Sequence, residues 1–218
     1  MKKERIGIFG GTFNPIHKGH MKAALEVQKT FLLDKVLLIP SYIPPHKGAS
    51  DVAPPSDRLQ MVKLAVASYP QFVPSPVEIK AKGKSYSILT LAKLKKQFPD
   101  AVIFFILGVD AFLEIDTWRE YRKVLEQCHF IVISRPGYDL NEAKKLLKGN
   151  YSERMVQVSE STKLDKVMLH RYKIFLLSID ALDIASLDVR KKVKMGKSIA
   201  GLVVEAVEEY IQTNKLYQ

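Results

Sequence analysis

The stretch RIGIFGGTFNPIHKGH, residues 5–20, decides how the rest of the chain is interpreted. It begins with a short apolar run that has the composition of a buried β-strand. Gly10 and Gly11 follow directly, and His17 and His20 stand three residues apart. A glycine pair at a strand end lets another group approach the backbone, and a helix or tight turn can aim both rings at one point. The stretch therefore predicts a strand, a binding turn and the start of a helix.

Similar apolar runs alternate along the chain with segments of helical periodicity. The runs KVLLIP, AVIFFIL, FIVIS and KIFLLSI are short and nearly continuous, like strands buried on both faces of a parallel sheet. Amphipathic helices are predicted within residues 20–33, 56–70, 87–100 and 141–150, with Ser56 as the N-cap of the second. Strand followed by helix, repeated, predicts a doubly wound α/β fold with a mostly parallel sheet.

Length and composition are those of one globular domain, which we expect to span residues 1–218. Hydrophobic residues make up 47% of the chain, enough for a sizeable core. Cys128 is the single cysteine and lies in an apolar run, so we expect a core residue in a reducing, cytoplasmic compartment. We expect no membrane span and no signal peptide, because the apolar runs are too short for either.

The formal net charge of +11 predicts anionic partners, although a solvated basic surface is an equal alternative. Open parallel sheets bind ligands beyond the carboxyl ends of their strands. Four segments expected there are rich in Gly, Pro, His, Asp or Trp, namely residues 10–20, 40–47, 108–118 and 134–138. Their agreement predicts one ligand site at that edge of the sheet.

The common phosphate-binding and metal-binding motifs do not account for the opening stretch. GKS at residues 196–198 lacks the earlier glycine of a P-loop, and the first turn lacks G-x-G-x-x-G. His17 and His20 have no third zinc ligand nearby in the sequence. A nucleotide site remains, in which phosphate lies against glycine backbone and a helix start while both histidines donate hydrogen bonds. Two purely structural histidines are the alternative.

The segment GGTFNPIHKGH resembles the T/HxGH signature of the nucleotidyltransferase α/β phosphodiesterase superfamily. Further segments resemble its bacterial nicotinate-nucleotide adenylyltransferase branch, in the expected order: IPSYIPPHK, DRLQMVKLA, SYSILTL, ILGVDAFLEIDTW, VISRPGY and VVEAVEEYIQTNKLY. The resemblance implies a Rossmann-like nucleotidyltransferase fold. It also implies transfer of AMP from ATP to nicotinate mononucleotide, giving deamido-NAD and pyrophosphate in NAD biosynthesis.

The resemblance also implies roles for individual residues. ATP is expected to contact Gly10, Gly11, Thr12, Phe13, Gly108, Asp110 and Ser186. The groups expected to act on the phosphates are His17, His20, Lys47 and Arg190. The nicotinate nucleotide is expected at Ser87 and Trp118, although core packing is an alternative for the tryptophan. Mg²⁺ is expected with ATP, held mainly by substrate and water, and the helical end 184–218 is expected to close the ATP site.

The chain departs from the family pattern at two places. The family segment I-S-x-T-x-[IV]-R is IASLDVR here, so Ala185 and Leu187 stand where hydroxyls are expected, and Leu187 takes the expected helix-capping position. Arg119 stands where an aromatic residue is common, which alters one wall of the expected nicotinate pocket.

Three alternatives stay open on the sequence. The acceptor could be nicotinamide mononucleotide or phosphopantetheine, or the chain could be a non-catalytic nucleotide- or RNA-binding relative. No RNP-like aromatic strand or KH-type GxxG clamp is present, so small-molecule substrates are favoured over nucleic acid. A homo-oligomer also remains open.

Overall fold

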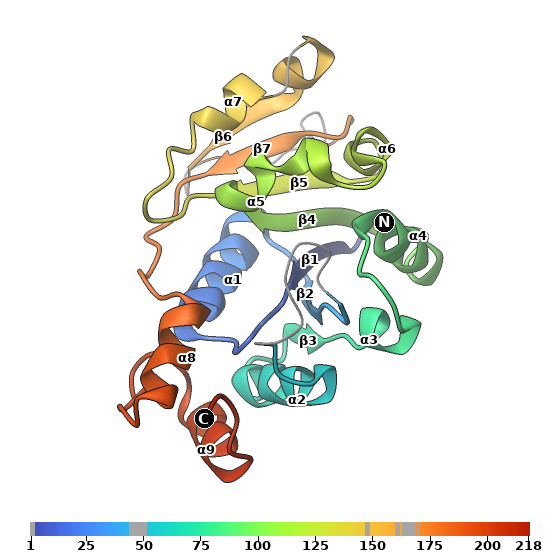
Figure 1. Cartoon of the computed structure of the whole chain (residues 1–218). Helices are drawn as coiled ribbons and strands as arrows, with labels where there is room; N and C mark the ends of the chain where they lie inside the picture. Colours follow the sequence, from blue (N-terminus) through green and yellow to red (C-terminus); the bar gives the residue numbers. More distant parts are fainter. Residues whose placement is uncertain (1–2, 44–51, 147–148, 160–161, 163–168, 170) are drawn as a thin grey trace.

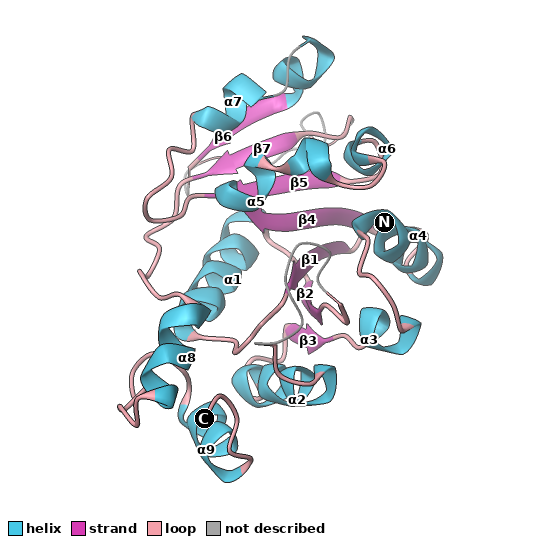
Figure 2. Cartoon of the chain, in the orientation of Figure 1, coloured by secondary structure: helices cyan, strands magenta, loops and turns pink. Residues whose placement is uncertain are grey.

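The computed structural model describes residues 3–43, 52–146, 149–159, 162, 169 and 171–218. Its centre is a sheet of seven strands in the order β3-β2-β1-β4-β5-β7-β6, and every described pair is parallel (Figures 1 and 2). The strands are β1 Arg5–Gly11, β2 Lys35–Pro40, β3 Phe72–Pro74, β4 Val102–Gly108, β5 His129–Ile133, β6 Met155–Val158 and β7 Ile174–Leu177. The predicted doubly wound α/β fold is confirmed.

Helices cover both faces of this sheet, and alternating strand residues point to one face or the other (Figure 1). One face packs on α1 Lys18–Phe31, α2 Pro55–Val66, α8 Ser186–Lys194 and α9 Glu205–Thr213. The other packs mainly on α4 Ser87–Gln97, α5 Val109–Leu113, α6 Tyr121–Leu125 and α7 Glu142–Leu146. The short α3 Val77–Ala81 and the 3₁₀ turns η2 Ile115–Thr117 and η3 Gly149–Arg154 complete the described helices. Cys128 is fully buried in the second cluster, as predicted.

The five predicted strands are all present, whereas β3 and β6 were not predicted. Both lie at the edges of the sheet, where one side of each strand has no strand partner among the described residues. β3 has only three residues and β6 only one buried residue, Val158. Neither carries the continuous apolar run that marks a strand buried on both faces, because neither is buried on both faces.

Two helices begin earlier than predicted. The first of them, α1, begins at Lys18, not at His20. Ser56 is not an N-cap, because α2 already begins at Pro55 with Pro54 before it. Proline fits the first helical position, where its missing N–H costs nothing. Residues 108–118, where no helix was predicted, contain α5 and η2. A five-residue helix and a single turn are too short to show helical periodicity.

The C-terminal helices belong to the same core as α1 and α2. Val189 of α8 and Val207 and Ile211 of α9 are buried in it. The Tyr210 hydroxyl donates to Asp57 of α2 at 2.8 Å. This packing holds the start of α8 close to the loop that follows β1. No helix in the described ranges is long and apolar enough to cross a membrane.

The topology marks one crevice for a ligand. From β1 the chain moves outward to β2 and β3, then crosses to β4 on the other side of β1. Connections from neighbouring strands diverge at such a switch point, which leaves a crevice at the carboxyl ends of the two strands. The crevice between β1 and β4 is therefore the expected position of the site.

Candidate active site

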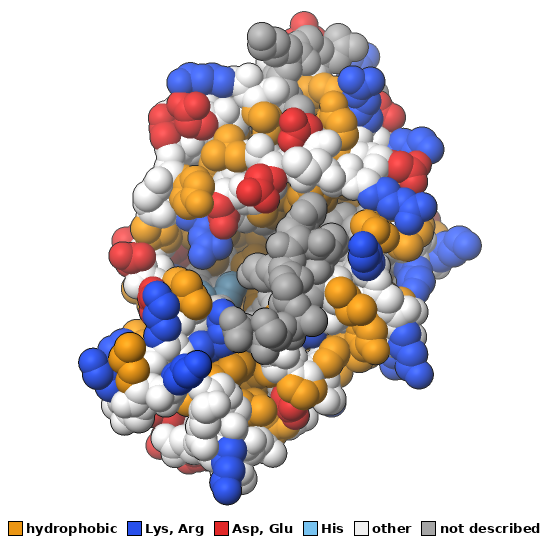
Figure 3. All heavy atoms as spheres, in the orientation of Figure 1, with side chains coloured by type: hydrophobic (Ala, Val, Ile, Leu, Met, Phe, Trp, Pro, Cys, Tyr) orange, Lys and Arg blue, Asp and Glu red, His pale blue; other side chains and the backbone are white. Residues whose placement is uncertain are grey.

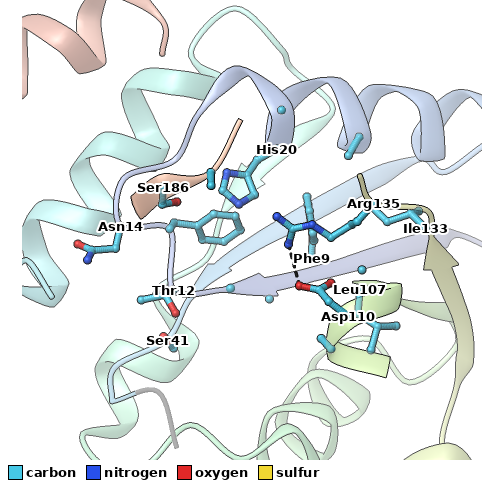
Figure 4. Close-up of a pocket in the computed structure, with 18 of the residues that line it drawn as sticks. Phe9, Thr12, Asn14, His20, Ser41, Leu107, Asp110, Ile133, Arg135 and Ser186 are labelled. Carbon is cyan, nitrogen blue, oxygen red and sulfur yellow. Dashed lines mark hydrogen bonds and ion pairs between the residues drawn. The ribbon is translucent and has the colours of Figure 1, made fainter. Parts of the chain in front are cut away.

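A pocket of about 1140 Å³ lies at that crevice (Figure 4). It is lined by every described residue that the sequence predicts to bind substrates: Gly10, Gly11, Thr12, Phe13, His17, His20, Ser87, Gly108, Asp110, Trp118, Ser186 and Arg190. Lys47 lies outside the described residues. Figure 3 shows histidine atoms within a hollow of the surface, close to Lys or Arg side chains. Residues far apart in the sequence therefore meet in one place.

At three glycines of the pocket, a side chain would enter open space or meet a neighbouring side chain. A Cβ on Gly10 would meet nothing within 4 Å, so this position leaves open space beside the backbone of β1. A Cβ on Gly11 would lie 3.3 Å from the ring of Phe13, so Gly11 makes room for a protein side chain. A Cβ on Gly108 would lie 2.3 Å from Oδ1 of Asp110. Only Gly10 leaves room that the protein itself does not fill.

The two histidines form a close pair at the start of α1. His17 is the N-cap residue and His20 lies in the first turn, and their ring centroids are 3.6 Å apart. The backbone N–H of His17 donates to Nδ1 of His20 at 3.2 Å. Because Nδ1 accepts, the proton of a neutral His20 lies on Nε2, which makes that atom a donor. The His20 ring also packs edge-on against Phe13 at 5.1 Å.

Burial gives His17 a different pKa from that of a histidine in water. His17 is 4% exposed. This burial, with a smaller effect of Arg135, lowers the pKa of His17 to about 3. The ring is therefore neutral at pH 7 and can offer a hydrogen bond but no positive charge. Among the described residues that line the pocket, Arg119, Arg135 and Arg190 carry a permanent positive charge.

Asp110 and Arg135 form an ion pair across the pocket, drawn as a dashed line in Figure 4. Nη1 of Arg135 lies 3.1 Å from Oδ2 of Asp110. The other carboxylate oxygen, Oδ1, is buried and accepts no hydrogen bond from any residue that the structure describes. Asp110 thus keeps one acceptor oxygen for a ligand, and Gly108 gives the pair its space.

The start of α8 is tied to the loop that follows β1. Ser186 Oγ donates to the carbonyl of Pro15 at 2.9 Å, and Arg190 Nη1 donates to the carbonyl of Asn14 at 2.9 Å. The N-cap residue is Ala185, which provides no side-chain hydrogen bond. Leu187 is already the second residue of the helix and is 51% exposed. The expectation that Leu187 takes the capping position is therefore wrong.

The opposite end of the pocket is built from α4 and the segment before α6. Ser87 is the first residue of α4. Trp118 is half-buried and packs edge-on against Phe105, with 5.9 Å between ring centroids. The guanidinium of the next residue, Arg119, lies over the ring of Tyr86 at 5.0 Å. A ligand contact and core packing were the two alternatives for Trp118. The structure allows both, because the indole contacts the core and also lines the pocket.

The cytidylyltransferase-like family model matches residues 8–192, which include the glycine turn, both histidines and Arg190. The chain belongs to the cytidylyltransferase-like family. A probable nicotinate-nucleotide adenylyltransferase of Desulfatibacillum aliphaticivorans is 42% identical over 98% of this chain and 99% of its own. One of Moorella thermoacetica is 40% identical over 98% of this chain and 92% of its own. The predicted resemblance to nicotinate-nucleotide adenylyltransferases is confirmed.

A solved structure shares the fold. It is the Plasmodium falciparum nicotinic acid mononucleotide adenylyltransferase complexed with NaAD, with a TM-score of 0.72 and 18% identity. The match covers 98% of this chain and 97% of that one. At that identity the comparison concerns the fold, including the all-parallel sheet and the helices at the C-terminus.

Three residues in or beside the pocket of this cytidylyltransferase-like chain were not singled out from the sequence. Arg135 and Glu78 line the pocket directly. Arg58 is fully buried and donates to the carbonyls of Ala53, Thr12 and Tyr42 at 2.8–3.1 Å, so it fixes the backbone beside the pocket. The sequence did hold a signal for Arg58, because it stands at a position of DRLQMVKLA that the helical periodicity predicts to be buried. A buried guanidinium needs hydrogen-bond acceptors around it.

Proposed function

We propose that this protein is a nicotinate-nucleotide adenylyltransferase, which transfers AMP from ATP to the 5′-phosphate of nicotinate mononucleotide. The products are deamido-NAD and pyrophosphate, and the reaction belongs to NAD biosynthesis. The observation that carries this proposal is a single pocket with a histidine pair at one end and Trp118 with Ser87 at the other. Full-length relatives named for this activity support it. A single buried cysteine is also consistent with a reducing compartment such as the cytoplasm.

The chemistry needs positioning and charge stabilisation more than proton transfer. An oxygen of the nicotinate mononucleotide phosphate forms a bond to the α-phosphorus of ATP, and the bond from that phosphorus to the α–β bridging oxygen breaks. The attacking phosphate is already ionised, so no general base is required. The protein then accelerates the reaction by aligning the two phosphates and stabilising the charge that develops on the leaving pyrophosphate.

We assign the ATP end to the groups around β1, α1 and α8. Gly10 and Thr12 lie where the backbone is open to the pocket, and Asp110 offers its Oδ1 to the adenosine. His20 donates from Nε2 to phosphate, and His17 contributes a neutral hydrogen bond. Arg190 provides positive charge from α8.

The remaining predicted ATP contacts complete this assignment. Gly11 and Phe13 shape the turn, Gly108 makes room for Asp110, and Ser186 holds α8 against the turn. Lys47, outside the described residues, is proposed as a further phosphate contact. Within the described residues no group of three or more His, Cys, Asp or Glu is placed to hold a metal ion. We propose that Mg²⁺ enters as part of the MgATP substrate, where it neutralises phosphate charge.

The acceptor end is assigned to Trp118 and Ser87. The indole would stack on the pyridine ring, since aromatic rings prefer offset or edge-to-face contacts with one another. Ser87 at the start of α4 would donate to the ring substituent, where the helix N-terminus also favours negative charge.

Pyrophosphate release tests the proposed function and its acceptor. Purified protein is assayed with MgATP and, separately, nicotinate mononucleotide, nicotinamide mononucleotide and phosphopantetheine. We expect the highest kcat/KM with nicotinate mononucleotide. A higher value with phosphopantetheine would overturn the acceptor assignment. Nucleotide binding without pyrophosphate release from any acceptor would overturn the enzyme assignment.

A further inference from the structure

We propose that Arg119 is a specificity-determining residue of the acceptor site. Its guanidinium favours a pyridine nucleotide whose ring bears a carboxylate over one whose ring bears a carboxamide. This inference rests on the proposed function. It assigns to Arg119 the discrimination between nicotinate mononucleotide and nicotinamide mononucleotide as acceptors.

Arg119 stands where such a choice can be made. It lines the pocket directly after Trp118, the residue assigned to the pyridine ring. Its guanidinium lies 5.0 Å from the centroid of the Tyr86 ring. Tyr86 is the N-cap residue of α4, and Ser87 begins that helix. The cation is therefore held beside the helix start that is assigned to the ring substituent.

The guanidinium keeps its hydrogen-bonding capacity for a ligand. Across the described part of the chain, no hydrogen bond from a protein group engages an N–H of Arg119. Its ion pair with Glu120 is long, with 3.9 Å between Nε and Oε1. The Glu120 carboxylate instead bonds the Nζ of Lys123 through its other oxygen. Arg119 is thus held by the aromatic ring below it and by no strong polar contact.

The other two pocket arginines are engaged differently. Arg135 is paired with Asp110 at 3.1 Å, and Arg190 donates to the carbonyl of Asn14 at 2.9 Å. Both lie toward the end of the pocket assigned to ATP. Arg119 is the pocket arginine on the Trp118 side, so an anionic ring substituent would meet its charge first.

A carboxyl group already lies at this end of the pocket, so a cation there would favour an acidic ligand. The carboxyl group of Glu78 also lines the pocket, and Thr90 Oγ1 donates to it at 2.6 Å. Burial raises the pKa of Glu78. Where Glu78 is ionised, a second carboxylate brought in by the substrate would be disfavoured beside it without a compensating positive group. A guanidinium offers two parallel N–H donors that match both oxygens of a carboxylate, whereas a carboxamide offers one oxygen and its own donors. The residue type therefore sets the direction of the selectivity.

The test compares Arg119→Met with Arg119→Lys and with a matched control. Arg122→Met is the control, because Arg122 also lies over a tyrosine ring, that of Tyr121 at 5.7 Å, but does not line the pocket. Its Nε also donates to the Tyr121 hydroxyl at 3.2 Å. For each variant, kcat/KM is measured with nicotinate mononucleotide and with nicotinamide mononucleotide, and KM is measured for ATP. Melting temperatures establish that each variant is folded.

We expect Arg119→Met to lower kcat/KM for the acid about three- to tenfold and to leave the value for the amide and the KM for ATP nearly unchanged. The expected effect is moderate because the Arg119 side chain is 54% exposed and solvent weakens its charge. Arg119→Lys should keep most of the preference, and Arg122→Met all of it. Raising the salt concentration from about 0.05 M to about 0.5 M should narrow the acid preference of the wild type but not of Arg119→Met.

The inference is overturned if Arg119→Met lowers kcat/KM equally for both nucleotides, or if the acid-to-amide ratio does not move. In either case the wild type would still transfer AMP, so the proposed function would survive. A wild type that uses neither nucleotide would overturn the proposed function itself, and this result is visible before any variant is made.

Discussion

The two ends of the pocket differ in how firmly the protein holds them. At the ATP end, His17 and Phe13 are buried, Arg58 fixes the carbonyl of Thr12, and Ser186 ties α8 to the same loop. At the acceptor end, Trp118 is half-buried and Arg119 is more than half exposed. The difference suggests that the two ends have separate functions. In the proposed function, the buried end would fix the geometry of phosphate transfer, and the exposed end would select the nucleotide acceptor.

The largest expected effect lies at the buried end. His20→Asn removes the Nε2 donor but keeps an acceptor near the backbone N–H of His17, which now bonds Nδ1 of His20. We expect kcat to fall by about 10²-fold or more, the usual cost of losing one donor to developing charge. Steady-state kinetics on folded protein measure this loss.

His129→Gln is the control for this histidine. His129 is buried, stacks on Phe104 with 5.0 Å between ring centroids, and does not line the ATP pocket. Its kcat should stay within about twofold of wild type. Near-normal turnover in His20→Asn would remove His20 from the chemistry and with it the proposed separation of functions between the two ends.

The next effect tests the exposed end. Trp118→Ala should raise KM for nicotinate mononucleotide roughly 5- to 100-fold, because one aromatic stacking partner is worth about 1–3 kcal/mol. KM for ATP should change little, and Trp118→Phe should recover part of the loss. An equal rise in both KM values would mean that the contact with Phe105 matters for the whole fold and that the two ends are not separate.

A third prediction uses pH to compare a pocket histidine with a core histidine. Burial lowers the pKa of His17 to about 3 and that of His129 to about 4, below the usual value of 6.5. Above pH 6.5 both are neutral in the folded and unfolded chain. As pH falls from 6.5 towards 4, only the unfolded chain takes up these protons, so stability falls, by up to about 2 kcal/mol per histidine at pH 5.

Denaturant unfolding between pH 7.5 and 5 measures this loss. The His129→Gln variant should show a shallower decline in stability than the wild type, even if it is less stable at pH 7.5. Saturating MgATP should reduce the part of the decline that belongs to His17, because phosphate beside the ring favours its charged form. Identical slopes in the wild type and in His129→Gln would contradict the account of the core histidine.

The smallest effect concerns α8. This helix comes from the C-terminal part of the chain and contacts the ATP end of the pocket. Ala185→Ser would supply the missing N-cap hydroxyl, worth about 0.5–2 kcal/mol of helix stability. Arg190 lies on that helix, so KM for ATP should fall a few-fold while kcat changes less. Leu187→Thr should not supply the cap, because Leu187 is the second residue of the helix, although it also lines the pocket. A gain from Leu187→Thr alone would show that position 187 contacts the substrate directly.

The sequence predicts most reliably the strands that are buried on both faces of the sheet. The five inner strands were recognisable because each is a continuous apolar run, whereas the edge strands β3 and β6 are only partly buried and carry no such run. The pocket residues could be proposed because Gly10, His17 and His20 belong to a specific motif.

Arg135 lies in segment 134–138, which was expected at the site, but nothing in the sequence shows its ion pair with Asp110. Glu78 lies in no predicted site segment, since its place in the pocket follows from packing between distant segments. The cap at Ala185 was misplaced by two residues for a related reason. The family pattern suggests a hydroxyl, but only the backbone shows where the helix begins.

The most direct test of the central claim follows the adenylyl group itself. ATP labelled with ³²P at its α-phosphorus is mixed with nicotinate mononucleotide, Mg²⁺ and an excess of enzyme, and the products are separated after a single turnover. The account predicts that the label appears in deamido-NAD in the wild type and that this transfer is at least about a hundredfold slower in His20→Asn. Label recovered as free AMP, or attached to the protein, would contradict direct transfer between the two nucleotides in this pocket.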